Sequence, residues 1–366
     1  MSLVEHHGDP FNPIWVIISE PYDKDQELNR LFSCGYGYNF KKIWKMGGLS
    51  DCYIRSVRPC IGATYDKPAS LSNLLSDIEY HTPKIIVPLS DEVLNFLVPE
   101  TRQQKEKNSS LRKWAGSLLQ SNYLKYSHYI IGSFDPEFVT RNWDQHEIQA
   151  FIHFGHVREE FEFIQKNGYL NPLPQRTLIV NPTYDILIDY LELCLTQKRL
   201  SVDIETIRPR KNTFYWEIKH PGYPYLMGIA ISPHNAISFN IWEYPPDQTV
   251  KVWRLMDRIF NEVPLIGQNF FVFDSHFKEA LGLRVNLKQT QDTLIRHHIL
   301  WPSLPHKLQF QTIQYTRQPY YKDEAAGFNY QKYKEKIMRY NALDCCITFE
   351  IYNEQEKEFQ ERPHLI

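Results

Sequence analysis

Apolar runs of strand length alternate with longer segments of helical periodicity along the first half of the chain. These runs are followed by turn residues or by helix-like patterns, and they cover residues 14–19, 52–57, 84–89 and 129–133. Continuous apolar runs of this length are typical of strands that are buried on both faces of a parallel sheet. Strands that alternate with helices predict a three-layer α/β domain, in which ligands bind at the carboxyl ends of the strands.

The clearest break in this pattern comes where Gly168 is followed by Asn171-Pro172 and Pro174, because glycine and proline interrupt regular structure. We therefore predict two domains, 1–165 and 166–366. In the second domain, a strand with alternating apolar and polar residues precedes two strands joined by a short turn, which favours a ribonuclease-H-like mixed sheet. The predicted elements of this domain are strands 177–180, 200–206, 225–232, 235–241 and 264–267 and helices 184–195, 249–260 and 329–361.

The strand at Leu200–Thr206 carries two acids. Asp203 and Glu205 lie two positions apart, so their carboxylates leave the same face of the strand. Two like charges held side by side repel each other unless a positive charge lies between them, and a divalent cation commonly supplies that charge. The pair therefore indicates a nuclease metal site, although Asp-x-Glu also occurs on ordinary solvated strand faces.

Further polar side chains lie in apolar surroundings later in the chain. Asn269 is placed to cap a helix, and Asp274 follows on that predicted helix among aromatic residues. Tyr340 and Asp344 are four residues apart in the predicted long helix, so they share one face. Taken alone, Asp274 is equally compatible with a capping or solvent-facing position.

Together these motifs resemble the 3′→5′ proofreading exonuclease domain of family A DNA polymerases, the DnaQ-like nucleases with a tyrosine in the third motif. Asp203-Ile204-Glu205 matches the first motif, Asn269 through Asp274 the second, and Tyr340 through Asp344 the third. The motifs occur in the family's order, with the aspartates 71 and 70 residues apart. The resemblance covers about residues 198–355. Other segments that resemble the family are Asp292-Thr293, Pro305–Leu308 and Tyr320–Glu324.

The resemblance implies two divalent cations, Mg²⁺ or Mn²⁺, held by Asp203, Glu205, Asp274 and Asp344, with Asp203 between the two ions. Hydrolysis of a phosphodiester places hydroxide against another anion, and two cations ~3.5–4 Å apart generate the nucleophile and stabilise the displaced oxygens. Carboxylate oxygens are the ligands that such hard cations prefer. Tyr340 would orient the attacking water through a hydrogen bond.

The same resemblance makes Asn269 and the backbone beside Thr206 candidates for holding the terminal nucleotide. Phe273 is a candidate for stacking on a frayed base, although packing in the core is an equal alternative. His297 and His298 are predicted to be core or surface residues rather than metal ligands. A basic loop after the acidic strand contains Arg208, Arg210, Lys211 and Lys219.

Residues 12–155 resemble the uracil-DNA glycosylase superfamily, nearest to its iron–sulfur branch. Ser19–Tyr22 stands where the family has a turn after its first strand, and Pro83–Val87 matches a later strand. The cluster-binding cysteines are missing as a set, Ser56 replaces the base-reading Asn, and Asp135 replaces the catalytic His. A carboxylate there would oppose the negative charge that builds on a leaving uracil. We therefore expect a glycosylase-like domain without glycosylase activity, with a DNA-binding or docking role.

Charge and cysteine content limit the class of protein further. The net charge is −2, so the chain is not a uniformly basic nucleic-acid coat, and any nucleic-acid binding must use local patches. One candidate patch is the basic stretch 102–113, for which a solvated surface loop is an equal alternative. The six cysteines include no Cys-x-x-Cys pair, so neither a disulfide framework nor a zinc knuckle is indicated. The expected setting is a reducing cytoplasm, or a host's cytoplasm for a viral chain. No run of the sequence approaches the ~18 apolar residues of a membrane span.

We predict a metal-dependent 3′→5′ DNA exonuclease that releases nucleoside monophosphates from single-stranded or frayed 3′ ends during replication. The chain ends at Ile366, shortly after the helix of the third motif. The expected partner is therefore a DNA polymerase of bacteriophage type, either as a separate subunit or as a continuation of this chain. The alternatives are an RNA 3′ exonuclease on the same fold and a DNA-binding or polymerase-docking module that hardly cuts.

Overall fold

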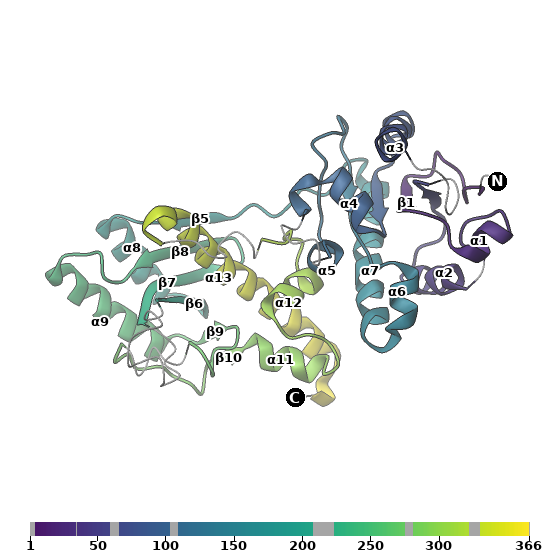
Figure 1. Cartoon of the computed structure of the whole chain (residues 1–366). Helices are drawn as coiled ribbons and strands as arrows, with labels where there is room; N and C mark the ends of the chain where they lie inside the picture. The colour runs from purple at the N-terminus through teal and green to yellow at the C-terminus, as the bar shows by residue number, and fades with distance from the viewer. Residues whose placement is uncertain are drawn as a thin grey trace, which may run out of the picture. The chain divides into compact units, whose positions relative to one another are not determined.

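The computed structural model describes residues 4–33, 35–58, 66–102, 109–207, 223–274, 281–321 and 330–365. They form two compact units (Figure 1). Unit 1 consists of Met1–Leu173 and the short segment Arg317–Tyr320, and unit 2 consists of Pro174–Thr316 and Tyr321–Ile366. The division falls after Leu173, which packs against the core of unit 1.

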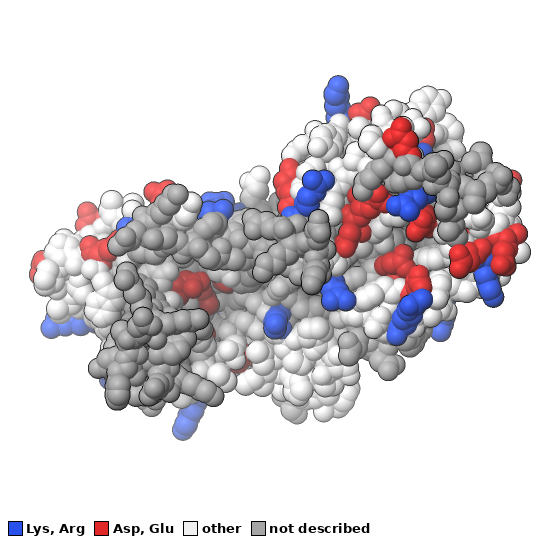
Figure 2. All heavy atoms as spheres, in the orientation of Figure 1, with Lys and Arg blue, Asp and Glu red and all other residues white. Residues whose placement is uncertain are grey.

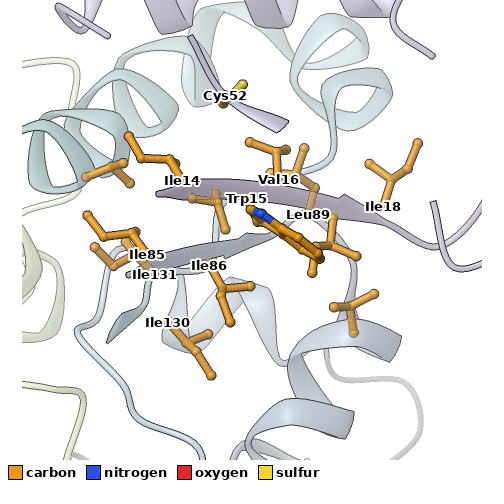
Figure 3. Close-up of a cluster of buried hydrophobic side chains, with 14 of the residues drawn as sticks. Ile14, Trp15, Val16, Ile18, Cys52, Ile85, Ile86, Leu89, Ile130 and Ile131 are labelled. Carbon is orange, nitrogen blue, oxygen red and sulfur yellow. The ribbon is translucent and has the colours of Figure 1, made fainter. Parts of the chain in front are cut away.

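Unit 1 is built on a parallel sheet of four strands. The strands are β1 (Ile14–Ile18), β2 (Tyr53–Ser56), β3 (Ile85–Pro88) and β4 (Tyr129–Ile130). Their order is β2-β1-β3-β4. All of β1 is buried, and in Figure 3 Ile14 and Val16 extend to one side of the strand while Trp15 extends to the other. Burial on both faces explains why these strands are continuous apolar runs, and it confirms the parallel α/β arrangement predicted from them.

Local sequence signals set the ends of several helices in unit 1. The described helices are α1 (Asp23–Glu27), α2 (Tyr36–Met46), α3 (Lys67–His81), α4 (Asp91–Leu97), η1 (Pro99–Thr101), α5 (Leu111–Trp114), α6 (Pro136–Arg141) and α7 (Trp143–Asn167). The side chains of Asp66 and Ser90 accept hydrogen bonds from backbone N–H groups in the first turns of α3 and α4, so these residues are N-caps. α7 ends at Gly168, whose φ of 77° lies in the left-handed region that glycine adopts at low cost.

The segment Arg317–Tyr320 comes from late in the chain but belongs to unit 1. The Arg317 guanidinium donates two hydrogen bonds to the carboxylate of Glu160, from Nε at 2.6 Å and from Nη2 at 3.0 Å. It also donates to the carbonyl oxygens of Asn171 and Pro172. Glu160 is only 3% exposed, so this guanidinium compensates a carboxylate that has lost most of its water.

Unit 2 is built on a mixed sheet of six strands in the order β10-β9-β6-β7-β8-β5. The strands are β5 (Thr177–Val180), β6 (Leu200–Ile207), β7 (Tyr223–Ser232), β8 (Asn235–Asn240), β9 (Leu265–Gly267) and β10 (Gln291–Asp292). β6, β7 and β8 pair antiparallel, whereas β9 pairs parallel with β6, β10 with β9, and β5 with β8. The acidic strand β6 therefore lies inside the sheet, and the predicted ribonuclease-H-like mixed sheet is confirmed.

Helices pack on both faces of this sheet. The described helices of unit 2 are α8 (Tyr184–Cys194), α9 (Pro246–Glu262), α11 (Thr293–Leu300), α12 (Leu308–Tyr315), α13 (Tyr330–Glu361) and η4 (Pro363–Leu365). Large residues such as Met227 and Ile229 pack with α8 and α9, whereas the alternate residue Ala230 packs with α13. Figure 1 shows these helices beside the strands of the sheet. Because strand side chains alternate, Asp203 and Glu205 lie on the face toward α13, opposite the buried Val202 and Ile204. Among the described residues, no helix is long and apolar enough to span a membrane.

Replacing Arg317 with Ala is expected to destabilise unit 1 by about 3 kcal/mol, because it leaves Glu160 buried without its counter-charge. Urea unfolding measures the change, and Glu160→Gln combined with Arg317→Ala should recover part of the loss. Arg158→Ala is the matched control, since Arg158 pairs with exposed glutamates at 3.8–3.9 Å on the same helix as Glu160. Equal stability of the Arg317→Ala and Arg158→Ala proteins would contradict the assignment.

His153 should make unit 1 less stable in acid. Burial, and then the nearby His156 and His146, lower the pKa of this side chain from 6.5 to about 3. The unfolded chain therefore takes up a proton near pH 6.5, while the folded protein resists protonation down to about pH 3. The stability contributed by the neutral side chain is fully present above pH 6.5 and is lost progressively as the pH falls toward 3, at up to about 1.4 kcal/mol per pH unit.

Urea unfolding of the wild-type protein and of His153→Phe, from neutral pH down to about pH 5, measures this contribution. The wild-type protein is expected to lose more stability over that range than the variant, which cannot take up the proton. Parallel pH curves for the two proteins would show that His153 contributes nothing to acid sensitivity.

Candidate active site

The two acids of β6 lie where this strand stops pairing regularly with β7. Asp203 is paired with Gly228, Glu205 with Leu226, and the register shifts between Glu205 and Thr206. Both acids are half-buried. A β-bulge changes the direction of a strand locally and is common beside active sites. Asp203 and Glu205 thus point toward α13 at an irregular part of the sheet.

Asp274 reaches the same strand from a turn that follows β9. The turn begins at Asn269, whose φ of 62° is left-handed, and the N–H of Phe273 donates to the Asn269 carbonyl oxygen. Asp274 is 1% exposed, and its Oδ1 accepts a hydrogen bond of 3.3 Å from the backbone N–H of Ile204. The contact places its carboxylate beside the backbone that joins Asp203 to Glu205. Asp274 lies in this turn, and residues 275–280, over which the predicted helix would continue, are outside the described residues.

Burial raises the pKa of Asp274 well above its usual range, and the negative charges of Asp292 and Glu205 raise it further. The hydrogen bond from Ile204 acts in the opposite direction, because it favours the ionised carboxylate. The site therefore holds like charges close enough to disfavour one another. A bound cation would relieve that repulsion.

Asp344 and Tyr340 come from one face of α13, as their spacing predicts. Asp344 is buried and accepts a hydrogen bond from the phenol of Tyr321, whose ring centroid lies 5.7 Å from that of Tyr340. The pKa of Tyr340 is raised far above its usual value, first by burial and then by the charges of Asp344, Glu205 and Asp203. Acids on β6 and α13 therefore act on the same phenol, which stays protonated.

Three buried polar residues support the acids, and the sequence motifs alone did not reveal these roles. The Asp292 carboxylate accepts hydrogen bonds from the backbone N–H groups of Asn269, Phe271 and Leu294, at 2.9, 3.3 and 2.9 Å, so it joins the turn after β9 to the start of α11. Tyr321 donates to Asp344, as described above. The third residue, Asn341, donates to Asp203. The available sequence signals were the resemblance at Asp292 and the position of Asn341 directly after Tyr340.

The proposed nucleotide-binding residues occupy different surroundings. Thr206 is half-buried at the bulge, and Asn269 is half-buried at the start of the turn. Phe273 packs against the hydrophobic core between the sheet and α8 and α9, which matches the packing alternative. On the same turn, Phe271 and Val272 are 38% and 72% exposed.

The donor set fits hard divalent cations, because Asp203, Glu205, Asp274 and Asp344 all offer carboxylate oxygens. Asp274 accepts a hydrogen bond from the backbone N–H of Ile204, between Asp203 and Glu205, and Asp203 accepts one from Asn341, three positions before Asp344 on α13. Among the described residues, no three or more His, Cys, Asp or Glu side chains meet closely enough to enclose an ion. The acids are thus neighbours on converging elements and are not closed around one point.

The histidines near α11 form a hydrogen-bonded chain. His297 bonds to His306 at 2.7 Å and to Gln314 at 2.8 Å, and His306 bonds to His298 at 2.9 Å. His297 is fully buried and His298 is exposed, which agrees with core and surface positions.

In unit 1, the two positions that depart from the glycosylase pattern lie in separate hollows. Asp135 caps α6, accepts a hydrogen bond of 3.0 Å from the Tyr22 phenol, and lines a cavity of about 820 Å³ with Tyr22, Glu20 and Arg141. Burial raises the pKa of Asp135. The buried Ser56 lines a different pocket of about 430 Å³.

Several of the basic residues noted in the sequence lie outside the described residues. These include Arg208, Arg210, Lys211 and Lys219 of the basic loop and Lys105 and Lys107 of the stretch 102–113. Over the face in view, Figure 2 shows acidic and basic side chains interspersed on the described part of unit 1. The described surface on this face is therefore of mixed charge.

A scan against protein-family models and a search of curated proteins both find no match. Among solved structures, the catalytic core of RRP6 from Trypanosoma brucei has a TM-score of 0.39 and 15% identity over 53% of this chain and 52% of that chain. The Aedes aegypti Nibbler EXO domain has a TM-score of 0.39 and 14% identity over 52% of this chain and 93% of that chain. The POL domain of Pol1 from M. smegmatis has a TM-score of 0.38 and 10% identity over 51% of this chain and 28% of that chain. The match spans about half of the RRP6 core, and the function is inferred from the residues of the site.

Replacing Asp292 with Ala is expected to destabilise unit 2 by about 3 kcal/mol, because backbone N–H groups at Asn269, Phe271 and Leu294 lose a charged acceptor. Asp292→Asn should lose less, since its one remaining carboxamide oxygen still accepts. Denaturant unfolding measures both changes against Asp189→Ala, which removes an exposed acid on α8. If Asp292→Ala unfolds at the same denaturant concentration as Asp189→Ala, Asp292 does not hold the turn.

Proposed function

We propose that unit 2 is a metal-dependent 3′→5′ exonuclease that hydrolyses phosphodiester bonds at DNA 3′ ends and releases nucleoside monophosphates. The observation that supports this most directly is the convergence of acids from separate elements. Asp203 and Glu205 come from β6, Asp274 from the turn after β9, and Asp344 from α13. Asp274 touches the backbone between the first two acids, and three of the four acids raise the pKa of the Tyr340 phenol.

In this proposal the four carboxylates hold two divalent cations, Mg²⁺ or Mn²⁺. Cations bound there would supply a hydroxide nucleophile and neutralise the charge on the attacked phosphate. The half-buried Asp203 and Glu205 can meet solvent and substrate, whereas Asp274 and Asp344 close the buried side of the site. The buried pair fixes the geometry, and the half-buried pair faces the nucleic acid.

Tyr340 serves as a hydrogen-bonding group and not as a general base. Its raised pKa keeps the phenol protonated at neutral pH, so the hydroxyl can donate to and accept from a water molecule without exchanging its own proton. The Tyr321 ring lies beside it, with the two ring centroids 5.7 Å apart. A phenol held in this way orients the attacking water.

The terminal nucleotide is proposed to lie against Thr206 and Asn269. Thr206 follows Glu205 directly at the bulge, and Asn269 begins the turn that ends in Asp274. Phe271 is exposed on that turn, so it replaces Phe273 as the aromatic side chain able to stack on a frayed base. Stacking of this kind favours single-stranded ends of either DNA or RNA.

A proofreading role beside a phage-type DNA polymerase is the biological setting we propose. In that setting, unit 1 is a glycosylase-like domain that has lost base excision and binds DNA or docks the polymerase. The carboxylate of Asp135 at its cavity supports the loss of excision, because it would oppose negative charge on a leaving base. A reducing cytoplasm remains the proposed compartment.

Digestion of end-labelled oligonucleotides tests the exonuclease proposal. With Mg²⁺ or Mn²⁺, the protein should shorten 5′-labelled single strands stepwise from the 3′ end and release mononucleotides, and EDTA should stop the reaction. Asp203→Ala should lower the rate by more than about a hundredfold, because losing a metal ligand exceeds the usual effect of losing an outer hydrogen bond. Asp189→Ala, an exposed acid on α8, should cut at the wild-type rate.

Cutting that persists in EDTA, or no cutting with either metal, would refute the proposal. An oligoribonucleotide in the same assay decides whether DNA or RNA is the preferred substrate. Faster degradation of RNA favours the RNA 3′ exonuclease. A uracil-containing strand should be shortened without release of free uracil. Appearance of uracil would show that unit 1 retains base excision.

A further inference from the structure

Asn341 connects three elements beneath the acid site. It is fully buried on α13, directly after Tyr340. Its Nδ2 donates to Asp203 Oδ2 at 2.8 Å and to the Asp203 carbonyl oxygen at 3.3 Å. Its Oδ1 accepts a hydrogen bond of 2.7 Å from the hydroxyl of Ser238 on β8. One amide therefore joins α13 to β6 and β8.

The sheet register explains how one side chain spans this distance. Asp203 is paired with Gly228, and Gly228 is paired with Ser238, so the three residues form one row across β6, β7 and β8. Asn341 lies over the middle of this row. A Cβ at position 228 would lie 2.6 Å from Asn341 Oδ1 and 2.6 Å from Cys345 Sγ. Gly228 thus provides the space in which the amide reaches both neighbours.

The two partners fix the orientation of the amide. The nitrogen must face Asp203, because an amide oxygen in that place would repel the carboxylate. The Ser238 hydroxyl donates to the oxygen on the other side, so turning the amide over would break both contacts. Ser238 is itself fully buried, which keeps water from competing for this bond.

We propose that Asn341, held by Ser238, is a positioning residue that sets the orientation of the Asp203 carboxylate for cation binding. A neutral donor suits this role, because it fixes Oδ2 without cancelling the negative charge that attracts the cation. The proposal rests on the proposed function insofar as Asp203 is a metal ligand. A space-filling role of Asn341 between helix and sheet is the competing explanation.

Calorimetric titration of the protein with Mn²⁺ alone tests the positioning role of Asn341 without requiring catalysis. Asn341→Ala is expected to weaken Mn²⁺ binding about 10- to 100-fold, the usual effect of losing an outer hydrogen bond to a metal ligand. Asn341→Asp keeps the size and the acceptor for Ser238 but removes the donor, so it should not restore binding. Asn353→Ala, on the same helix and only partly buried, is the matched control and should bind as the wild type does.

A double-mutant cycle tests the connection to Ser238. Ser238→Ala should weaken Mn²⁺ binding less than Asn341→Ala does, because the amide keeps its contact with Asp203. In the Asn341→Ala background, Ser238→Ala should have no further effect, since the two residues act through one contact. Ser238→Ala also serves as the milder variant if Asn341→Ala does not fold, as judged by circular dichroism.

The cleavage assay adds a kinetic distinction. Asn341→Ala and Ser238→Ala should each lower kcat at fixed Mn²⁺ with little change in KM for the oligonucleotide. The reason is that Asn341 acts on Asp203 and not on the nucleotide. Full Mn²⁺ affinity in Asn341→Asp, additive effects in the cycle, or a loss confined to thermal stability would each overturn the proposal. A wild-type protein that binds Mn²⁺ but cuts nothing refutes the exonuclease function, while the Mn²⁺ titrations still decide the role of Asn341. A wild-type protein that binds no Mn²⁺ overturns both.

Discussion

Carboxylates that are brought together away from water repel one another, and unit 2 places four of them on converging elements. The cost is visible at Asp274, whose pKa is raised by burial and by the charges of Asp292 and Glu205. It is visible again at Tyr340, where three acids oppose ionisation of the phenol. A protein retains such an arrangement only when the rest of the fold holds the acids in place, or when a cation relieves the repulsion.

The fold holds these acids with neutral hydrogen-bond donors. The backbone N–H of Ile204 donates to Asp274, the Asn341 amide donates to Asp203, and the Tyr321 phenol donates to Asp344. Neutral donors stabilise an ionised carboxylate without cancelling its charge. The donors identified here therefore fix the positions of the acids and preserve the negative field that attracts a divalent cation.

Unit 1 has a cavity at the carboxyl ends of a parallel sheet, which is the usual place for a ligand. Asp135 lies at the N-terminus of α6 and lines this cavity, and its carboxylate accepts a hydrogen bond from the Tyr22 phenol. This unit also includes Arg317, which comes more than a hundred positions after Leu173 in the sequence and pairs with the buried Glu160.

The sequence by itself determined those features that depend on short-range periodicity. The alternation in Leu200–Thr206 predicted that Asp203 and Glu205 share a face, and the spacing of Tyr340 and Asp344 predicted the same for α13, because strand and helix geometry repeat over two and about four residues. The continuous apolar runs of the first half predicted a buried parallel sheet for the same reason. The order of the motifs led to the prediction that Asp203, Glu205, Asp274 and Asp344 form one site.

Only the tertiary structure decided what holds those acids and what the neighbouring residues do. Asn341 reaches Asp203 across 138 residues of sequence, and it does so because Gly228 leaves room between them. Asp292 supports the turn that carries Asp274 through backbone N–H groups at Asn269 and Phe271. Phe273 packs against the core, whereas Phe271 is exposed. Contacts of this kind depend on strand register and on space between packed elements, and no local pattern of residues encodes either.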